Sequence, residues 1–303
     1  MSDYNIEAVK KAGTDWILST DTAEDIPADW LKENDIDEHP LHYVFDGVEY
    51  GNELENTMTL EQFYERIRNG EMPTTSATAV AYSEELFTKR IGKGQKNILH
   101  IAFSSGLSGT YANTVLAAKD VTAEHPEANI VVLDTKSATA GVIVLIYHLL
   151  EMKKNGATME EAVHFAEENI PKIRVHFTVG NLFHLMRGGR LSKTSAVLGT
   201  VMRIQPILRV EDAGTLASMD RVRGRRQALK YLCDEIGTSE NFENVTCVSI
   251  THTCCLEDAE ALAKMIREAY PQVREIPINM LSQTVGSHTG IGCLVIGYLA
   301  GTR

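Results

Sequence analysis

Residues 97–111 (NILHIAFSSGLSGTY) constrain the fold more than any other stretch of the chain. The apolar run 98–103 has the length and composition of a buried strand. A turn with two glycines and four serine or threonine hydroxyls follows, and a helical pattern begins at about Tyr111. In an open α/β sheet, such a turn lies at the carboxyl end of its strand, where ligands usually bind.

The composition of this turn favours recognition of an anion. Its glycines allow the backbone to approach a ligand closely, and free amides at the start of a helix attract negative charge. We interpret the turn as a loop for a carboxylate or a phosphate. The alternative is that Ser108 or Thr110 only caps the helix. The loop lacks the lysine of GxxxxGK[ST], which argues against an ordinary nucleotide-binding loop.

Length and composition set the wider limits. A chain of 303 residues is long enough for two domains. Its net charge of −12 argues against a general nucleic-acid binder, which needs a basic face. We expect no secretory leader and no transmembrane segment, because the longest apolar stretch, 141–150, is too short. The five cysteines form no CxxC pair, which favours a reducing cytoplasm and no metal site.

The first half alternates strands with helices, which predicts a mostly parallel sheet. The expected strands are 15–21, 98–103 and 129–134, with a hairpin in 36–50 that turns at Asp46-Gly47. The expected helices are 59–69, 80–91, 111–121, 141–150 and 157–169. Asp25 is a candidate cap for a helix that Pro27 starts. Four hydroxyl residues in 74–78 exceed what one cap requires, so they are either ligand donors or ordinary turn residues.

The pattern changes near Pro171, where we place a boundary between an α/β domain 1–171 and an α/β domain 172–303. The second domain is expected to contain a mixed sheet. Its expected strands are 173–179, 197–201, 205–210, 214–219, 244–252 and 273–279. Its expected helices are 182–186, the later part of 221–236, and 256–270. A glycine-rich turn at 286–292 precedes an apolar run to Leu299.

Six short motifs, in this order across nearly the whole chain, carry a family resemblance. They are DTAEDI at 21–26, PTTS at 73–76, SGLSGTY at 105–111, RGGR at 187–190, QPIL at 205–208 and GSHTG at 286–290. Together they resemble the DegV family, fatty-acid-binding proteins that include the FakB subunit of bacterial fatty acid kinase. The sequence departs from the family's frequent T-S-Q-P-S, because Ala77-Thr78-Ala79 follow Thr75-Ser76.

The resemblance implies two α/β domains with a long-chain fatty acid in a tunnel between them. It implies no cofactor and no ATP site in this chain, which would present the fatty-acid carboxylate to a separate FakA-like kinase for acyl-phosphate formation. By matching motifs, the family's carboxylate-binding residues fall on Thr75, Ser76 and Ser108, with Ser105 and Gly109 nearby, and on Arg190 and His288. Without the resemblance, the favoured interpretation is a core histidine for His288 and a surface cation for Arg190.

Two other functions remain open at this level. A serine-dependent acyl hydrolase has serines and histidines to draw on, although no GxSxG elbow surrounds Ser108. A phosphosugar-binding regulator would need a basic pocket.

The basic run 221–226 (RVRGRR) is notable on an acidic protein. It is either a solvated face or a docking patch for the kinase, in which Arg223 and Arg225 would take part.

Overall fold

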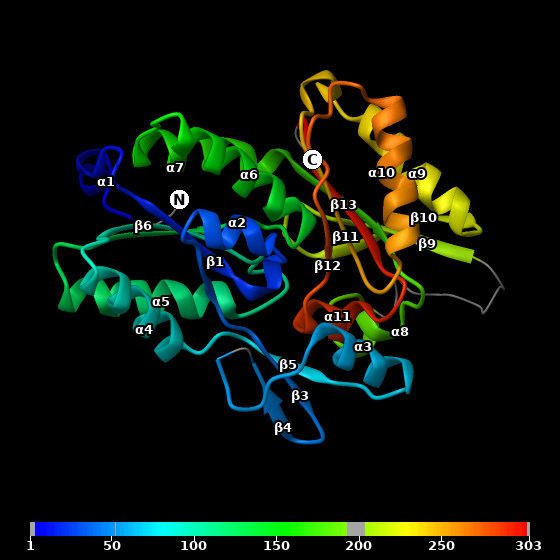
Figure 1. Ribbon diagram of the computed structural model, residues 1–303, viewed down its shortest axis with the longest axis horizontal. Helices are drawn as coiled ribbons and strands as arrows, with labels where there is room; N and C mark the ends of the chain where they lie inside the picture. Colours follow the sequence, from blue (N-terminus) through cyan, green and yellow to red (C-terminus); the bar gives the residue numbers. More distant parts are fainter. Residues whose placement is uncertain (1–3, 52, 193–203, 302–303) are drawn as a thin grey trace.

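The computed structural model describes residues 4–51, 53–192 and 204–301, in which three sheets are arranged side by side (Figure 1). The first sheet has the strand order β2-β1-β6-β7 and is parallel throughout. Its strands are β1 (Ile17–Asp21), β2 (Asp37–His39), β6 (Asn97–Ala102) and β7 (Asn129–Asp134). Every residue of β1 is buried, as expected for a strand covered on both faces.

Helices cover both faces of this sheet. Figure 1 shows α6 and α7 above it and α4 and α5 below it. The helices of this part are α1 (Ile6–Ala12), α2 (Ala28–Glu33), α4 (Val80–Gly92), α5 (Thr110–Glu124), α6 (Ala140–Lys154) and α7 (Met159–Asn169). A short 3₁₀ turn, Thr22–Glu24, follows β1. The strand–turn–helix unit that the sequence predicted around the glycine-rich turn is confirmed as β6, the turn and α5.

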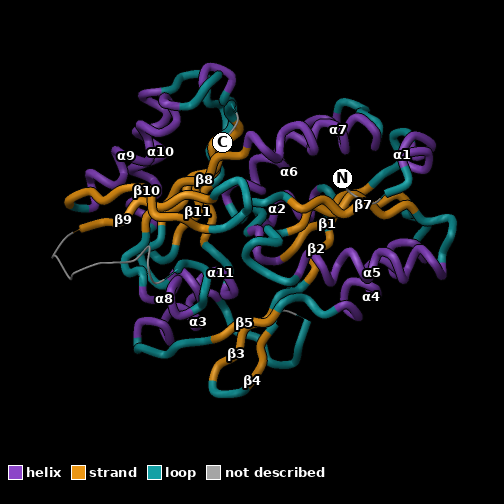
Figure 2. Tube along the Cα trace, turned by 180° about the vertical axis from the view of Figure 1, so that it is seen from behind, coloured by secondary structure: helices purple, strands orange, loops and turns teal. Residues whose placement is uncertain are grey.

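The second sheet has the order β10-β9-β8-β13-β11-β12 and is mixed, because only the β11–β12 pair is parallel. Its strands are β8 (Ile173–Thr178), β9 (Ile204–Val210), β10 (Leu216–Arg223), β11 (Val248–His252), β12 (Ile278–Met280) and β13 (Leu294–Leu299). Figure 2 shows α9 (Arg225–Thr238) and α10 (Leu256–Ala269) on its outer side. The expected mixed α/β architecture, with a parallel first sheet, is confirmed.

Helix α6 connects the two sheets. It packs on strands of the second sheet, and its first seven residues, from Ala140, are all buried. A side chain at Gly297 on β13 would overlap the backbone of Ala140, so glycine is what permits this close approach. One continuous apolar core therefore contains Leu99 and Ile146 from the first part as well as Val175 and Val295 from the second sheet.

A third sheet, of order β4-β3-β5, lies beside the other two. Its strands are β3 (His42–Phe45), β4 (Val48–Tyr50) and β5 (Thr74–Ser76), and it packs against α11 (Gln283–Thr289). Helix α3 (Leu60–Arg68) lies against α11, while α8 (Phe183–Arg187) contacts α11 as well. The predicted hairpin is confirmed, and Asp46 and Gly47 both have positive φ at its turn.

The structure corrects several local predictions. Asp25 does not cap α2: it has a φ of 57°, and its carboxylate accepts the amide of Ser282 at 2.6 Å. Residues 286–289 belong to helix α11 rather than to a turn, and Thr75 lies in β5 rather than in a turn. The predicted strand 273–279 is reduced to β12, and the predicted strand 197–201 lies outside the described residues.

Candidate functional site

A cavity lies where the three sheets meet. Its volume is ≈ 140 Å³, about ten times the ~10–15 Å³ that one water molecule needs on the same measure. The carboxyl ends of β6 and β7 supply one wall, the inner face of the second sheet supplies another, and β5 with α11 closes one side. The carboxyl edge of a parallel sheet is the usual place for a ligand in such folds.

Most of the wall is apolar. The second sheet contributes Val175, Phe177, Val210 and Val295, each at least nine-tenths buried. The first part contributes small or apolar residues in return: Ala23, Leu41, Phe103 and Ala138. Alternation along β8 explains the pairing of Val175 with Phe177, because residues i and i+2 point to the same face of a strand. Such a wall favours a hydrocarbon over a polar metabolite.

The polar part of the wall combines residues that are far apart in the sequence. Thr75 Oγ1 lies 2.8 Å from His288 Nε2, which joins β5 to α11. Ser108 and Gly109 come from the turn before α5, and Arg190 comes from the segment after α8. The cavity thus has hydroxyls, an imidazole and a guanidinium on a wall that is otherwise apolar.

The glycine-rich turn is held by its neighbours. Asp21 Oδ2 accepts the amide of Phe103 at 2.8 Å, and the Ser104 amide donates to the Ser137 carbonyl at 3.0 Å. Ser108 Oγ accepts the Thr110 amide at 3.2 Å and lies 2.9 Å from the Thr110 hydroxyl. Ser108 therefore does assist the start of α5, yet it also lines the cavity.

The charges around His288 make this part of the wall electropositive. Burial, together with Arg190, Arg187 and His184, lowers the pKa of His288 to about 3, so its ring is neutral at ordinary pH. Arg190 Nε donates to the Leu107 carbonyl at 3.0 Å, and burial lowers the Arg190 pKa from its usual value. His288 Nδ1 is buried without a hydrogen-bond partner among the described residues. In these contacts Arg190 donates to backbone carbonyls and not to a carboxylate, so its charge is available to a bound anion.

The remaining predicted residues differ in whether they line the cavity. Arg190 lines the cavity, whereas Arg187 donates to the carbonyls of Pro73 and Ser287 at 2.6 and 3.3 Å. Ser105 lies outside the cavity wall, is exposed, and its hydroxyl accepts from Lys136 Nζ at 2.5 Å.

Ser76 does line the cavity, but its hydroxyl donates to Glu49 Oε1 at 2.8 Å. The resemblance placed this serine among the residues that bind the ligand carboxylate, and it gave no sign that Glu49 would accept the serine's hydrogen bond.

Sequence reasoning missed Thr284 and Thr289, which also line the cavity. Both lie on α11 with His288, and the i, i+4 spacing of Thr284 and His288 places these two on one helical face. That periodicity was available as a signal, but Gly286 and Gly290 led to the interpretation of a turn.

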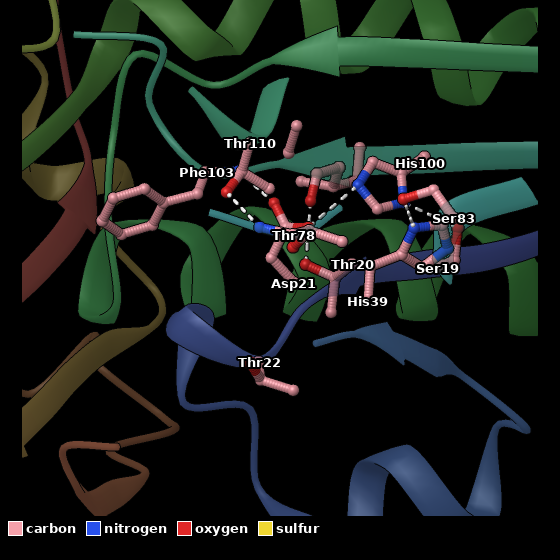
Figure 3. A network of polar contacts seen from close by, with 12 residues as sticks. Ser19, Thr20, Asp21, Thr22, His39, Thr78, Ser83, His100, Phe103 and Thr110 are labelled. Carbon is pink, nitrogen blue, oxygen red and sulfur yellow. Dashed lines mark hydrogen bonds and ion pairs between the residues drawn. The ribbon is translucent and has the colours of Figure 1, made fainter. Parts of the chain in front are cut away.

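A second cluster of polar side chains lies inside the first sheet (Figure 3). Ser19 Oγ is 2.9 Å from His100 Nδ1, and His100 Nε2 is 3.5 Å from Asp21 Oδ1. The His39 and His100 rings lie 4.4 Å apart, and His39 Nδ1 is 2.8 Å from Ser83 Oγ. All five side chains are buried, and none of them lines the cavity.

The proposed docking arginines differ in their surroundings. Arg223 ends β10 and is exposed. Arg225 begins α9 and forms an ion pair with Asp258 at 2.8 Å, while its Nη1 donates to the Gly292 carbonyl at 2.9 Å. Much of the Arg225 side chain is therefore already engaged by Asp258 and by the Gly292 carbonyl.

Residues 4–51, 53–192 and 204–301 contain neither a cluster of metal ligands nor a membrane-spanning helix. No group of three or more His, Cys, Asp or Glu side chains is placed to hold a metal ion in these ranges. Within the same ranges, no helix has the length and apolar character needed to cross a bilayer.

Comparison with known proteins identifies the family. Residues 16–301 match the family model described as "Uncharacterised protein, DegV family". A DegV domain-containing protein of Clostridium perfringens is 38% identical over 288 residues, which are 95% of this chain and 98% of that protein.

Solved structures agree with this assignment. A DegV lipid-binding protein of Thermotoga maritima matches with a TM-score of 0.81 and 26% identity, over 95% of this chain and 99% of that one. The fatty acid kinase B3 protein of Streptococcus pneumoniae, loaded with linoleic acid, shares the fold with a TM-score of 0.83 at 21% identity, over 94% and 99% of the two chains. The family model and the sequence identity along nearly the whole length lead to one conclusion: this chain belongs to the DegV family.

Proposed function

We propose that this protein binds a long-chain fatty acid in the cavity, with the carboxylate at the wall formed by Thr75, Ser108, Arg190 and His288. The observation that carries the proposal is a mostly apolar cavity with one electropositive group of hydrogen-bonding side chains. The lipid-binding relative from Thermotoga maritima supports the same ligand class.

The energetics fit a ligand with one charged end. Each buried CH₂ contributes about 0.8 kcal/mol, so the tail supplies most of the affinity. The carboxylate must be hydrogen-bonded, because an unpaired charge in a dry site is costly. Thr75 and Ser108 supply hydroxyls, and Arg190 supplies charge. The neutral His288 ring would gain an anionic neighbour, which raises its pKa from about 3.

We further propose that the bound carboxylate is presented to a separate ATP-dependent kinase in the cytoplasm, which forms the acyl phosphate. In this scheme the docking surface includes Arg223 and Arg225, and the chain divides into domains 1–171 and 172–303. The first strand of the second sheet, β8, starts at Ile173, next to that division.

The hydrolase alternative gains no support from the geometry. The Ser19–His100–Asp21 cluster contains the three residue types of a hydrolase triad, but each side chain is at most 3% exposed. The hydrogen-bonding partner of Ser108 is Thr110. His288 faces Thr75, and a pKa of about 3 makes it a poor general base at neutral pH.

The direct test is to identify the ligand. Protein purified from a bacterial host is denatured and extracted, and the extract is analysed by mass spectrometry for fatty acids. We expect close to one fatty acid per chain, or equivalent uptake of added palmitate or oleate after delipidation. The control is Ala138→Trp, which fills the cavity and should abolish uptake. Wild-type protein that neither carries nor takes up fatty acid would refute the proposal.

A further inference from the structure

The starting observation is the hydrogen bond between Ser76 and Glu49. Ser76 lies on β5 and lines the cavity, next to Thr75. Glu49 lies on β4, on the other side of β3 in the third sheet. The serine hydroxyl donates to the glutamate carboxylate at 2.8 Å. A protein carboxylate therefore already accepts the hydroxyl proton of a serine residue that lines the cavity.

The same carboxylate oxygen of Glu49 also lies beside a buried histidine. Glu49 Oε1 lies 3.4 Å from His42 Nδ1, and His42 Nε2 contacts Glu53. His42 is 3% exposed and packs edge-on against Tyr82 with 5.3 Å between the ring centres. The Glu49 side chain is half exposed, but its contacts with Ser76 and His42 position its carboxylate.

The chemistry of a hydroxyl makes this contact competitive. A serine hydroxyl carries one proton, so it can donate to Glu49 or to a ligand carboxylate, not to both. Glu49 also adds a negative charge beside Ser76, a residue that lines the cavity, and like charges repel.

We infer that Glu49 is a built-in competitor of the ligand carboxylate: it holds the Ser76 proton and lowers the affinity for fatty acid. The inference rests on the proposed function, and it defines the role of Ser76. Its hydroxyl can donate to the ligand carboxylate only after its hydrogen bond to Glu49 is broken. A site that exchanges its ligand with a partner enzyme gains from such moderation, because the ligand dissociates faster.

The first test removes the competitor. Delipidated wild type, Glu49→Gln and Glu49→Ala are titrated with palmitate and, separately, with hexadecanol, which has the same tail without a charge. We expect both variants to bind palmitate about three- to tenfold more tightly, and hexadecanol with nearly unchanged affinity. Glu55→Gln, which removes the same charge from an exposed position nearby in the chain, serves as the control. Circular dichroism and urea unfolding check that each variant is folded.

The second test is a double-mutant cycle with Ser76→Ala. In the wild type, Ser76→Ala should change palmitate affinity by less than about twofold, because Glu49 holds the hydroxyl. In the Glu49→Ala protein, the same serine change should weaken binding about fivefold or more, because the freed hydroxyl now serves the ligand.

The outcomes separate the two proposals. If no protein in the series binds palmitate or hexadecanol, the proposed function fails. If all bind, and Glu49→Gln and Glu49→Ala bind palmitate no more tightly than the wild type, the competitor role is wrong. It is also wrong if hexadecanol affinity rises as much as palmitate affinity, or if Ser76→Ala has the same effect in both backgrounds.

Discussion

Two clusters in this protein each pair a hydroxyl with an imidazole, but they differ in access to a cavity and in the charges around them. The cluster around His288 joins a hydroxyl to an imidazole at 2.8 Å and lines a cavity beside Arg190. The cluster around His100 joins a hydroxyl to an imidazole at 2.9 Å and adds the carboxylate of Asp21, and all three side chains are buried. Figure 3 shows the second cluster.

The difference lies in access and in the sign of the charge. The His288 cluster has space beside it and cations around it, so it is suited to an anion. The His100 cluster has carboxylates around it: burial and Asp21 raise the pKa of Glu38 to about 7, and burial, with Asp21 and Asp25, raises that of Glu24 well above its usual value. Residue types alone would assign hydrolase chemistry to the His100 cluster, although its side chains are buried and do not line the cavity.

The largest effect should come from deleting the buried imidazole. His100→Ala leaves a cavity and unpaired partners at Ser19 and Asp21, so we expect a loss of about 2–4 kcal/mol in the free energy of unfolding. Urea unfolding of delipidated protein measures it. The matched control is His164→Ala, an exposed histidine on α7, which should change stability by less than about 0.5 kcal/mol. Equal losses in the two variants would erase the distinction between the clusters.

Substitutions in the cluster around His288 should change the affinity for fatty acid. Thr75→Ala and Ser108→Ala each remove a hydrogen bond to a charged group, which costs about 1.5–3 kcal/mol, or roughly ten- to a hundredfold in fatty-acid affinity. Displacement of a fluorescent fatty acid gives the affinities, and Thr75→Ser, which retains the hydroxyl, is the control. Full affinity in both alanine variants would place the carboxylate elsewhere.

His288 and Glu38, one beside each cluster, should contribute to the pH dependence of stability with opposite signs. The pKa of His288 is about 3 in the folded protein, below its ordinary 6.5, so the unfolded chain binds more protons between these values. This histidine therefore lowers stability as the pH falls below about 6.5. Glu38 has a raised pKa of about 7, above its ordinary 4.5, so it raises stability as the pH falls from 7 towards 4.5.

Two variants test these signs in delipidated protein. Relative to wild type, His288→Gln should lose less stability on acidification from pH 6.5 to 4.5, and Glu38→Gln should lose more. The measurement is the free energy of unfolding in urea at several pH values. Deviations of the same sign in both variants would contradict the electrostatic contrast.

The smallest effect concerns the proposed docking surface. Arg223→Glu should leave fatty-acid affinity unchanged and slow acyl-phosphate formation by the host's kinase subunit about two- to fivefold, more at low salt than at high salt. Arg223 is the sharper choice, because changing Arg225 would also break its ion pair with Asp258. Acyl-phosphate rates equal to wild type at low salt would remove Arg223 from the interface.

Local signals in the sequence were sufficient for many elements. Thr59 forms the expected cap of α3, with Gln62 completing a capping box, and the Asp46-Gly47 hairpin forms as predicted. These features depend on residues within a few positions of one another. The α11 helix was missed because glycine usually breaks helices, whereas Gly286 makes room for the ring of Tyr64.

The sequence by itself determined the α/β alternation, the glycine-rich turn at a strand's carboxyl end and, through its ordered motifs, the family. Only the tertiary structure decided which hydroxyls face the cavity. It places Thr75 within hydrogen-bond distance of His288, leaves Ser105 exposed and directs the Ser76 hydroxyl to donate to Glu49. The reason is physical: the cavity is formed where three sheets meet, and contacts such as that between Thr75 and His288 join residues 213 positions apart, which leaves no local trace in the chain.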